Sequence, residues 1–556
     1  MATINQYFDF SLLAQSAYEN LSGVAYGDND ALKNRLAASG NDSGFTAKQA
    51  ELFTDGINGF SLRDHNPNGL LTGFSASLFE SNANPGEFTL ALRGTEPTDP
   101  RDLLSDTDLA LTGLARDQII SMYRYYKQLI TPAGQAVNYS SAELLTLAGI
   151  KDFTDTPLAT SVSYLVLLAE TSFDTGLGKL SPTAKINVVG HSLVGSLAMA
   201  FVNLFPNAVA HAYTFNGAGL GGAGIELIDR ITGVQSSVAS NLVTNLIADP
   251  NNDFTAGVGT VLGETKRSFI EKQSLAFSDH SMGLLTDSLA LQSLLARIDP
   301  SLTLDKLNIL LKSASADPAN TLELTLDALR TLFQKNYQYG QLEYDAVPTM
   351  VGDGATARNA YYVNLQSLQT WWKDSPFTGL SIQPLAEVNG SQIATLALAD
   401  TAEGMAYRYA LYKLNPFVVT GSSALYDGIN AHNELKLYSP ASNTGHFTEQ
   451  YLRDRAAMLT WKLGFGTKDT APVGDTFVKP QGGTPFYFED FTSNAITTKM
   501  RIGGGDSVDA VMSRPLGDFK FVVFGSENGD VLTGQGKDDR LYGGGWINEA
   551  FWQEVA

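Results

Sequence analysis

The order of apolar and polar positions predicts strands that alternate with helices in the first half of the chain. Five segments have the apolar or alternating pattern of strands: residues 72–79, 87–93, 185–189, 210–215 and 242–248. Three segments have the apolar spacing of helices: residues 117–129, 160–170 and 193–205. Because the turn-rich residues 81–86 separate the first two strands, we expect a hairpin there. The later strands alternate with helices, which predicts crossover connections and a largely parallel sheet.

The second half of the chain has a different pattern. Leucines recur at helical spacing through residues 302–311 and 322–332, and residues 448–463 also have a helical pattern. Beyond residue 465, Gly, Pro, Thr and Asp become frequent and short apolar triplets stand between turns, which is typical of β structure. A chain of 556 residues is too long for one ordinary core. We therefore predict three regions: an α/β domain with a helical N-terminal part over residues 1–285, a mainly helical cap or second domain over 286–465, and a β tail over 466–556.

The charge balance narrows the classes of partner. The chain has 37 basic and 58 acidic residues, a net charge of -21. Nucleic-acid phosphates favour clusters of Lys and Arg, so this balance argues against a nucleic-acid partner. It also argues against electrostatic docking on anionic lipid, so any lipid contact should be hydrophobic. Some of the acidic residues are candidates for calcium ligands.

Cysteine and targeting signals give little information about location. The chain has no cysteine, so structural disulfides are impossible. The N-terminal residues lack a basic segment followed by an apolar core, so we expect no N-terminal signal peptide. No apolar run approaches the roughly 18 residues that a membrane span needs. These features alone would predict a cytoplasmic protein.

Residues 188–195, Val-Val-Gly-His-Ser-Leu-Val-Gly, join a predicted strand to a predicted helix at Ser192. A serine hydroxyl becomes a useful nucleophile when a base removes its proton and a sharp strand-to-helix turn presents its oxygen. The glycine two residues before Ser192 lets strand and helix approach, and the helix N-terminus directs N–H groups toward a developing oxyanion. We predict Ser192 as the nucleophile. The alternative is a coincidental Gly-x-Ser in a strand–helix turn.

This segment resembles the signature of bacterial and fungal lipases of the α/β-hydrolase fold, in which Gly-His-Ser-Leu is followed by glycines. The resemblance implies an α/β-hydrolase fold. The chain departs from the pattern at Val194, where the family has glycine. We expect a Cβ at this position to crowd the strand against the helix.

The strand at residues 88–93 ends in Arg93-Gly94-Thr95. It is similar to the oxyanion-strand motif of class 3 lipases, in which the residue after Arg-Gly supplies a backbone N–H. By that resemblance the oxyanion hole consists of Leu193, directly after the nucleophile, and Thr95. One such donor stabilises a transition state by about 3–4 kcal/mol.

Elimination among the six histidines leaves three candidates for the base. In this fold the acid and then the histidine follow the serine, which excludes the two histidines up to residue 191. The histidine inside the predicted strand at 210–215 is more simply a packed core residue. The remaining candidates are His280, His432 and His446. We favour His280, because its turn precedes a helical pattern and resembles the Asn-His-Ser context of RTX-type lipases.

The predicted strand at residues 242–248 is followed by two candidate acids, Asp249 and Asp253. Such an acid holds the imidazole tautomer and stabilises the imidazolium. We favour Asp253, which precedes Phe-Thr-Ala-Gly like the acid of similar lipases, and Asp249 remains the alternative. Either aspartate could instead simply cap a turn.

Residues 525–533 and 534–542 are two nonapeptides with Gly at position 1, Asp at position 6 and Leu at position 8. They resemble the RTX calcium repeat, and a third repeat begins at 543 and then fails. The resemblance implies a short RTX-like β-roll with inward leucines and a Ca²⁺ cofactor. Its candidate ligands are Asp530 and Asp539 with the turn glycines Gly534 and Gly536. Two and a fraction repeats would give one incomplete site, and a Gly/Asp-rich loop is the alternative.

RTX repeats accompany type I secretion, so the resemblance implies a secreted protein and the type I secretion machinery as a partner. This route uses an uncleaved C-terminal signal, which would explain the missing signal peptide and the missing cysteine together.

The sequence thus predicts a lipase with an α/β-hydrolase fold, a largely helical cap and a short C-terminal all-β segment. We expect it to hydrolyse acylglycerol esters at a lipid–water interface through Ser192, His280 and Asp253 and an acyl-enzyme. Phospholipase A1 activity and a broad esterase or polyesterase activity are alternatives with the same triad. An alternative of another class is a calcium-dependent binding or toxin module on an inactive hydrolase.

Overall fold

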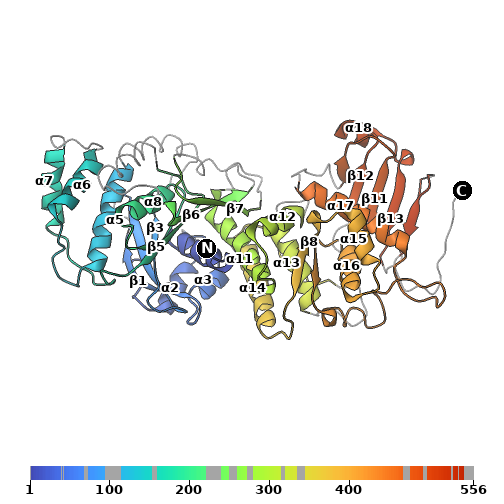
Figure 1. Cartoon of the computed structure of the whole chain (residues 1–556), viewed down its shortest axis with the longest axis horizontal. Helices are drawn as coiled ribbons and strands as arrows, with labels where there is room; N and C mark the ends of the chain where they lie inside the picture. The colour runs from blue at the N-terminus through green and yellow to red at the C-terminus, as the bar shows by residue number, and fades with distance from the viewer. Residues whose placement is uncertain are drawn as a thin grey trace. The chain divides into compact units, whose positions relative to one another are not determined.

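The computed structural model describes most of the chain (Figure 1). The described residues are 2–38, 40–41, 43–67, 73–93, 114–152, 160–220, 240–249, 260–271, 280–314, 320–334, 345–467, 476–492, 498–526, 530–535 and 537–543. They divide into two compact units. Unit 1 comprises residues 1–293 and 353–362, and unit 2 comprises residues 294–352 and 363–556.

Unit 1 is a mixed α/β structure built on a seven-stranded sheet. The strands are β1 (Phe60–Asn66), β2 (Ser75–Ser81), β3 (Phe88–Arg93), β4 (Ile186–His191), β5 (Val209–Phe215), β6 (Val243–Asp249) and β7 (Glu264–Phe269). They lie in the sheet in chain order. The strands β1, β2 and β3 are antiparallel neighbours, which confirms the predicted hairpin of β2 and β3, and every later pairing through β7 is parallel. The largely parallel sheet therefore follows the sequence pattern.

Helices of unit 1 cover both faces of this sheet. They are α1 (Ile4–Ser16), α2 (Asn29–Leu36), α3 (Ala47–Phe53), α5 (Leu114–Ile130), α6 (Ser141–Asp152), α7 (Thr160–Thr171) and α8 (Val194–Leu204), with α11 (Met282–Ile298) and α14 (Ala355–Lys373) crossing the boundary between the units. Ala212 of β5 belongs to the core formed with α5 and α8, whereas the next residue, Tyr213, stacks on Phe10 of α1 at 4.1 Å. Successive strand residues point to opposite faces, so α8 and α1 lie on opposite sides of the sheet.

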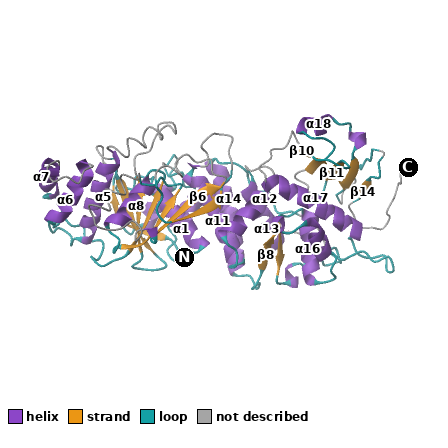
Figure 2. Ribbon diagram, turned by 45° about the horizontal axis from the view of Figure 1, so that its top comes forward, coloured by secondary structure: helices purple, strands orange, loops and turns teal. Residues whose placement is uncertain are grey.

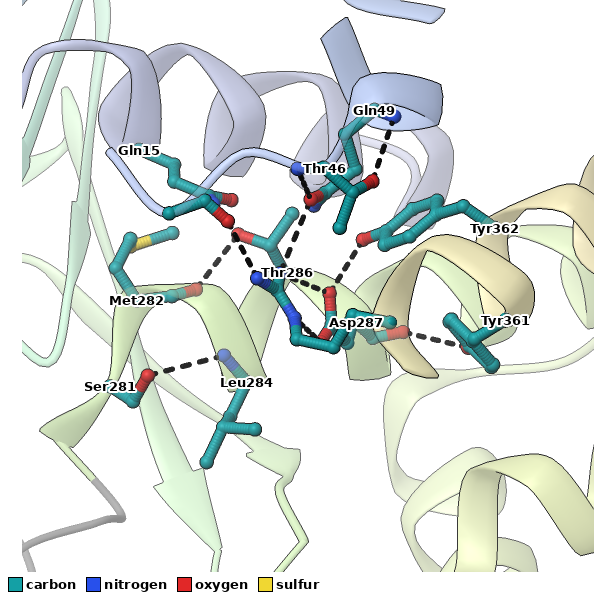
Figure 3. A network of polar contacts seen from close by, with 12 residues as sticks. Gln15, Thr46, Gln49, Ser281, Met282, Leu284, Thr286, Asp287, Tyr361 and Tyr362 are labelled. Carbon is teal, nitrogen blue, oxygen red and sulfur yellow. Dashed lines mark hydrogen bonds and ion pairs between the residues drawn. The ribbon is translucent and has the colours of Figure 1, made fainter. Parts of the chain in front are cut away.

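Asp287 anchors the first half of α11, and Figure 3 shows its contacts with Tyr361 and Tyr362. Nε and Nη2 of Arg358 lie 2.6 and 2.8 Å from the two carboxylate oxygens of Asp287. The hydroxyl of Tyr362 donates to the same carboxylate at 2.8 Å, and that of Tyr361 donates to the Asp287 carbonyl at 2.9 Å. Removing one partner of such a pair leaves a buried charge and typically costs about 3–5 kcal/mol. These contacts hold the helix that directly follows His280.

Unit 2 combines helices with two further sheets (Figure 2). Its helices are α12 (Leu304–Ala314), α13 (Thr321–Phe333), α15 (Gly390–Ala397), α16 (Ala402–Lys413), α17 (Glu449–Thr467) and α18 (Val508–Ser513), with short 3₁₀ turns at Leu385–Glu387, Ser423–Leu425 and Leu516–Asp518. The strands β8 (Ser381–Pro384) and β9 (Phe417–Thr420) form an antiparallel pair. A five-stranded sheet contains β10 (Thr476–Lys479), β11 (Phe486–Asp490), β12 (Thr498–Ile502), β13 (Lys520–Phe524) and β14 (Arg540–Tyr542), in the order β10-β12-β11-β13-β14.

The five-stranded sheet is joined to α17 by buried polar contacts. Arg455 is fully buried and its Nη1 lies 2.6 Å from Oδ1 of Asp490 at the end of β11. Its guanidinium also lies 4.6 Å from the ring centre of Phe524. Asp454 contacts Nε of Arg540 at 2.8 Å and accepts a hydrogen bond from the hydroxyl of Tyr542. The last described strand is therefore held by α17. Among the described residues, no helix is long and apolar enough to cross a membrane.

Candidate active site

The strand β4 ends at His191, and the next residue, Ser192, has a left-handed backbone with φ of 65°. A non-glycine residue rarely adopts this conformation, which stores strain and is typical of functional sites. Its N–H donates to the carbonyl of Phe215 at 3.1 Å. Its carbonyl accepts from the N–H groups of Gly195 and Ala218 at 2.9 and 3.0 Å. These bonds fix a sharp turn between β4 and α8 at Ser192.

At this turn, the backbone approaches too closely for a side chain at Gly190 and Gly195, but not at Val194. A Cβ on Gly190 would lie 2.8 Å from the carbonyl oxygen of Val194, and one on Gly195 would lie 2.7 Å from Cα of Gly217. Val194 itself is 5% exposed and belongs to the core on the α8 face of the sheet. The valine side chain therefore fills core space, and the crowding expected from the motif does not arise from its Cβ.

The structure brings Ser192 and His280 together across 88 residues. Nε2 of His280 lies 2.8 Å from Oγ of Ser192. His280 precedes α11, which begins at Met282, and Ser192 is only 7% exposed. When the imidazole is neutral and carries its proton on Nδ1, the serine hydroxyl donates to Nε2. This is the hydrogen bond through which a general base removes a nucleophile's proton.

A second histidine, His191, lies beside this pair. Its Nε2 is 2.8 Å from the carbonyl oxygen of His280, and its Nδ1 is 2.5 Å from the hydroxyl of Tyr18. The guanidinium of Arg93 donates to the carbonyl of Tyr18. Sequence reasoning set His191 aside as a base and gave no role to Tyr18. No local pattern could have found Tyr18, because its link to His191 spans 173 residues.

The other predicted site residues are only partly described. Leu193 directly precedes α8, at the helix end where backbone N–H groups lack partners within the helix. Thr95 and Asp253 lie outside the described residues. Asp249 is the last residue of β6 and its backbone pairs with Phe269. The catalytic acid and the second oxyanion donor thus stay predictions.

Three further histidines, His211, His432 and His446, lie on other elements of the chain. His432 and His446 belong to unit 2, where Nδ1 of His432 lies 3.1 Å from Glu434. His211 lies within β5, as expected, and its Nε2 is 2.9 Å from the hydroxyl of Thr244. Burial lowers the pKa of His211, and also that of His446.

The C-terminal aspartates already bind backbone groups. The carboxylate of Asp539 accepts from the N–H groups of Phe521 and Gln535 at 2.8 and 2.6 Å, and that of Asp530 accepts from the N–H of Ser526. Gly534 lies against Asp539, and Gly536 is outside the described residues. Over the described parts of the chain, no three His, Asp or Glu side chains come close enough to hold a metal ion. In the structure these two carboxylates cap turns of the chain, and calcium binding by the repeats stays a prediction.

Around these aspartates, two contacts join residues that are 18 positions apart in the sequence. Parallel strands β13 and β14 pair Val523 with Leu541, and the bond from Phe521 to Asp539 spans 18 residues, the length of two nonapeptides. Leu532 and Leu541 pack against the apolar core of this sheet. Both leucines are partly buried, and the RTX-like roll stays a prediction.

Comparisons with known proteins add little. No protein-family model and no curated protein matches the chain. Among solved structures, the chain is similar to the Lip2 lipase from Yarrowia lipolytica, with 17% identical residues and a TM-score of 0.25. That match covers 50% of this chain and 81% of the other. A likeness this distant carries no argument about activity, so the geometry of the site has to carry any functional conclusion.

Proposed function

We propose that the chain is a serine carboxylic-ester hydrolase of the α/β-hydrolase fold, acting as a lipase on acylglycerols. The observation that carries the proposal is the 2.8 Å contact between Nε2 of His280 and Oγ of Ser192, at a serine held with φ of 65°. A nucleophile bonded to its base on a sharp strand-to-helix turn is the arrangement that acyl transfer requires. The Gly-His-Ser-Leu motif and the order of Ser192 before His280 support the same function.

In this mechanism Oγ of Ser192 attacks the ester carbonyl carbon while Nε2 of His280 accepts the hydroxyl proton. The tetrahedral oxyanion accepts hydrogen bonds from the backbone N–H groups of Leu193 and Thr95. His280 then donates the proton to the leaving alcohol, which leaves an acyl-enzyme on Ser192. A water molecule deprotonated by the same imidazole hydrolyses it. Asp253, with Asp249 as the alternative, stabilises the imidazolium.

A lipid–water interface is proposed as the place of action. The helix α7 exposes four large apolar side chains: Val162, Leu165, Val166 and Leu168. Exposed apolar groups gathered on one helix are typical of surfaces that contact other apolar matter. The net charge of -21 favours hydrophobic over electrostatic contact with lipid. Calcium binding by the C-terminal repeats and type I secretion rest on the repeat resemblance alone and are kept as proposals.

Two measurements on matched variants test the hydrolase. Ser192→Ala should abolish ester hydrolysis and labelling by a fluorophosphonate probe, because its hydroxyl is the attacking group. Ser181→Ala, at an exposed serine whose side chain contacts Thr183, is the matched control and should keep both. Retention of more than a few per cent of activity in Ser192→Ala would contradict the assignment. Absence of labelling in the wild type would favour an inactive hydrolase that serves as a binding module.

The substrate is tested separately from the chemistry. A lipase should hydrolyse emulsified triglyceride faster than phospholipid at matched ester concentration. Higher rates on phospholipid would indicate a phospholipase A1. Activity confined to soluble p-nitrophenyl esters would indicate a broad esterase.

A further inference from the structure

His191 has both ring nitrogens bonded to groups from distant parts of unit 1. His191 is 6% exposed, with its Nε2 at 2.8 Å from the His280 carbonyl oxygen and its Nδ1 at 2.5 Å from the Tyr18 hydroxyl. A carbonyl oxygen can only accept, so Nε2 of His191 carries a proton and donates. In the neutral ring Nδ1 then accepts from the hydroxyl of Tyr18. The two neighbours therefore set both the tautomer and the orientation of this imidazole.

Tyr18 is held in turn by the end of β3. The guanidinium of Arg93, the last residue of that strand, donates to the carbonyl of Tyr18 and lies 5.8 Å from the centre of its ring. The rings of Tyr18 and His191 pack edge to face at 5.6 Å, and those of His191 and His280 lie 4.7 Å apart. A continuous set of contacts thus runs from β3 through Tyr18 and His191 to the backbone of His280.

We propose that Tyr18 and His191 are positioning residues for the base. The bond from His191 to the carbonyl of His280 fixes the backbone from which the His280 imidazole projects toward Ser192. Tyr18 fixes the ring that makes this bond. The inference rests on the proposed function, because it takes His280 as the base of an ester hydrolase. Its physical reason is that a misplacement of about 1 Å can cost a hundredfold in rate.

Three variants separate the two bonds of His191. The amide nitrogen of a glutamine reaches about as far as Nε2, so His191→Gln keeps a donor for the His280 carbonyl. An asparagine amide reaches only as far as Nδ1, so His191→Asn keeps a partner for Tyr18 and loses the bond to His280. Tyr18→Phe removes the hydroxyl alone. The readouts are kcat and KM on a soluble ester, with the working enzyme counted by fluorophosphonate titration.

We expect His191→Asn to lower kcat per titrated site by about tenfold or more, which corresponds to about 1.4 kcal/mol in the barrier. His191→Gln and Tyr18→Phe both keep the donor to the His280 carbonyl and lose the bond between residues 18 and 191, so each should lower kcat by about fivefold, as the loss of a bond of about 1 kcal/mol predicts. KM should change little in all three, because a positioning role affects the geometry of the base and not the binding of substrate. The matched control is Tyr139→Phe, which loses a hydroxyl bond of 2.7 Å to Asp174 and should leave kcat unchanged.

Three outcomes would overturn the positioning role. In the first, His191→Asn is as active per titrated site as His191→Gln. In the second, Tyr18→Phe behaves like Tyr139→Phe. In the third, the variants lose thermal stability and titratable sites but keep kcat per site, as a purely structural role predicts. Failure of the proposed function gives a different result: either the wild type is not labelled by the fluorophosphonate probe, or Ser192→Ala hydrolyses the ester as well as the wild type.

Discussion

At the scale of single residues, Gly190 and Val194 have different roles where β4 meets α8. A methyl group on Gly190 would meet the backbone carbonyl of Val194 at 2.8 Å, and backbone cannot rotate away as a side-chain tip can. Val194 points instead into the core, where it is 5% exposed. The glycine before the nucleophile is thus required by geometry, and the valine after it is tolerated.

Gly190→Ala should therefore damage both folding and catalysis. Overpacking of this size typically costs about 1–3 kcal/mol of stability. The shift of the turn that presents Ser192 should lower kcat/KM by about a hundredfold. Gly56→Ala is the control, because a Cβ there meets nothing within 4 Å. Thermal melting and ester hydrolysis report the two effects, and a fully active Gly190→Ala would show that the turn can relax.

His65 on β1 makes stability depend on pH. Burial, with a smaller contribution from the charge of Arg93, lowers the pKa of His65 from 6.5 to about 4. Its Nδ1 is 2.9 Å from the hydroxyl of Ser77. The unfolded chain therefore binds this proton at a higher pH than the folded chain, so stability rises with pH between these values. The destabilisation is absent above about pH 6.5, grows as the pH falls, and is complete below about pH 4.

We expect this residue to remove about 3 kcal/mol of unfolding free energy between those limits, at about 1.4 kcal/mol per pKa unit. His65→Asn does not titrate there and should flatten the pH dependence of the denaturation midpoint. An unchanged slope in His65→Asn would mean that other groups set the acid sensitivity.

At the scale of elements, Asp539 stabilises the segment that joins β13 to β14. Its carboxylate joins the N–H of Phe521 in β13 to the N–H of Gln535, and so ties the turn before β14 to its neighbouring strand. A calcium ion would have to share or replace these bonds. Asp539 can thus stabilise the segment between β13 and β14 by capping its turn, with or without an added cation.

Limited proteolysis separates these two roles. Asp539→Ala should speed cleavage after β13 even in chelator, because two backbone N–H groups lose their acceptor. Asp538→Ala, at the exposed neighbouring carboxylate, is the matched control and should cleave like the wild type. If the repeats bind calcium, the ion should also slow cleavage of the wild type by ordinary linkage. Equal wild-type rates with calcium and with chelator would contradict the calcium proposal.

At the scale of the whole molecule, the net charge of -21 should affect how the proposed lipase approaches a charged substrate surface. On an anionic lipid interface the repulsion should slow hydrolysis at low salt, and added salt should relieve it as the Debye length falls to about 8 Å. Initial rates on zwitterionic and anionic emulsions of the same ester, over a range of salt, measure this. The rate should rise with salt only on the anionic surface. A rate that falls with salt there would indicate a local basic docking site.

Local sequence was sufficient for much of the architecture, because periodicity and turn chemistry act over neighbouring residues. The predicted strands at 185–189, 210–215 and 242–248 correspond to β4, β5 and β6, and the predicted helix at 193–205 corresponds to α8. The short strand β7, with Glu264, Lys266 and Arg267 among its six residues, was not predicted, because its polar sequence carries no apolar alternation. Pairing with β6 makes it a strand.

The sequence by itself determined the turn at Ser192, since the β-branched run, the glycine and the following helix are all local. Chain order and turn context also pointed to His280, but only the tertiary structure placed its Nε2 at 2.8 Å from the serine oxygen. Tertiary structure alone decided two further contacts, the hydrogen bond between Tyr18 and His191 and the ion pair between Arg358 and Asp287. These partners are 173 and 71 residues apart, and their meeting depends on how whole helices and strands pack, which no local pattern encodes.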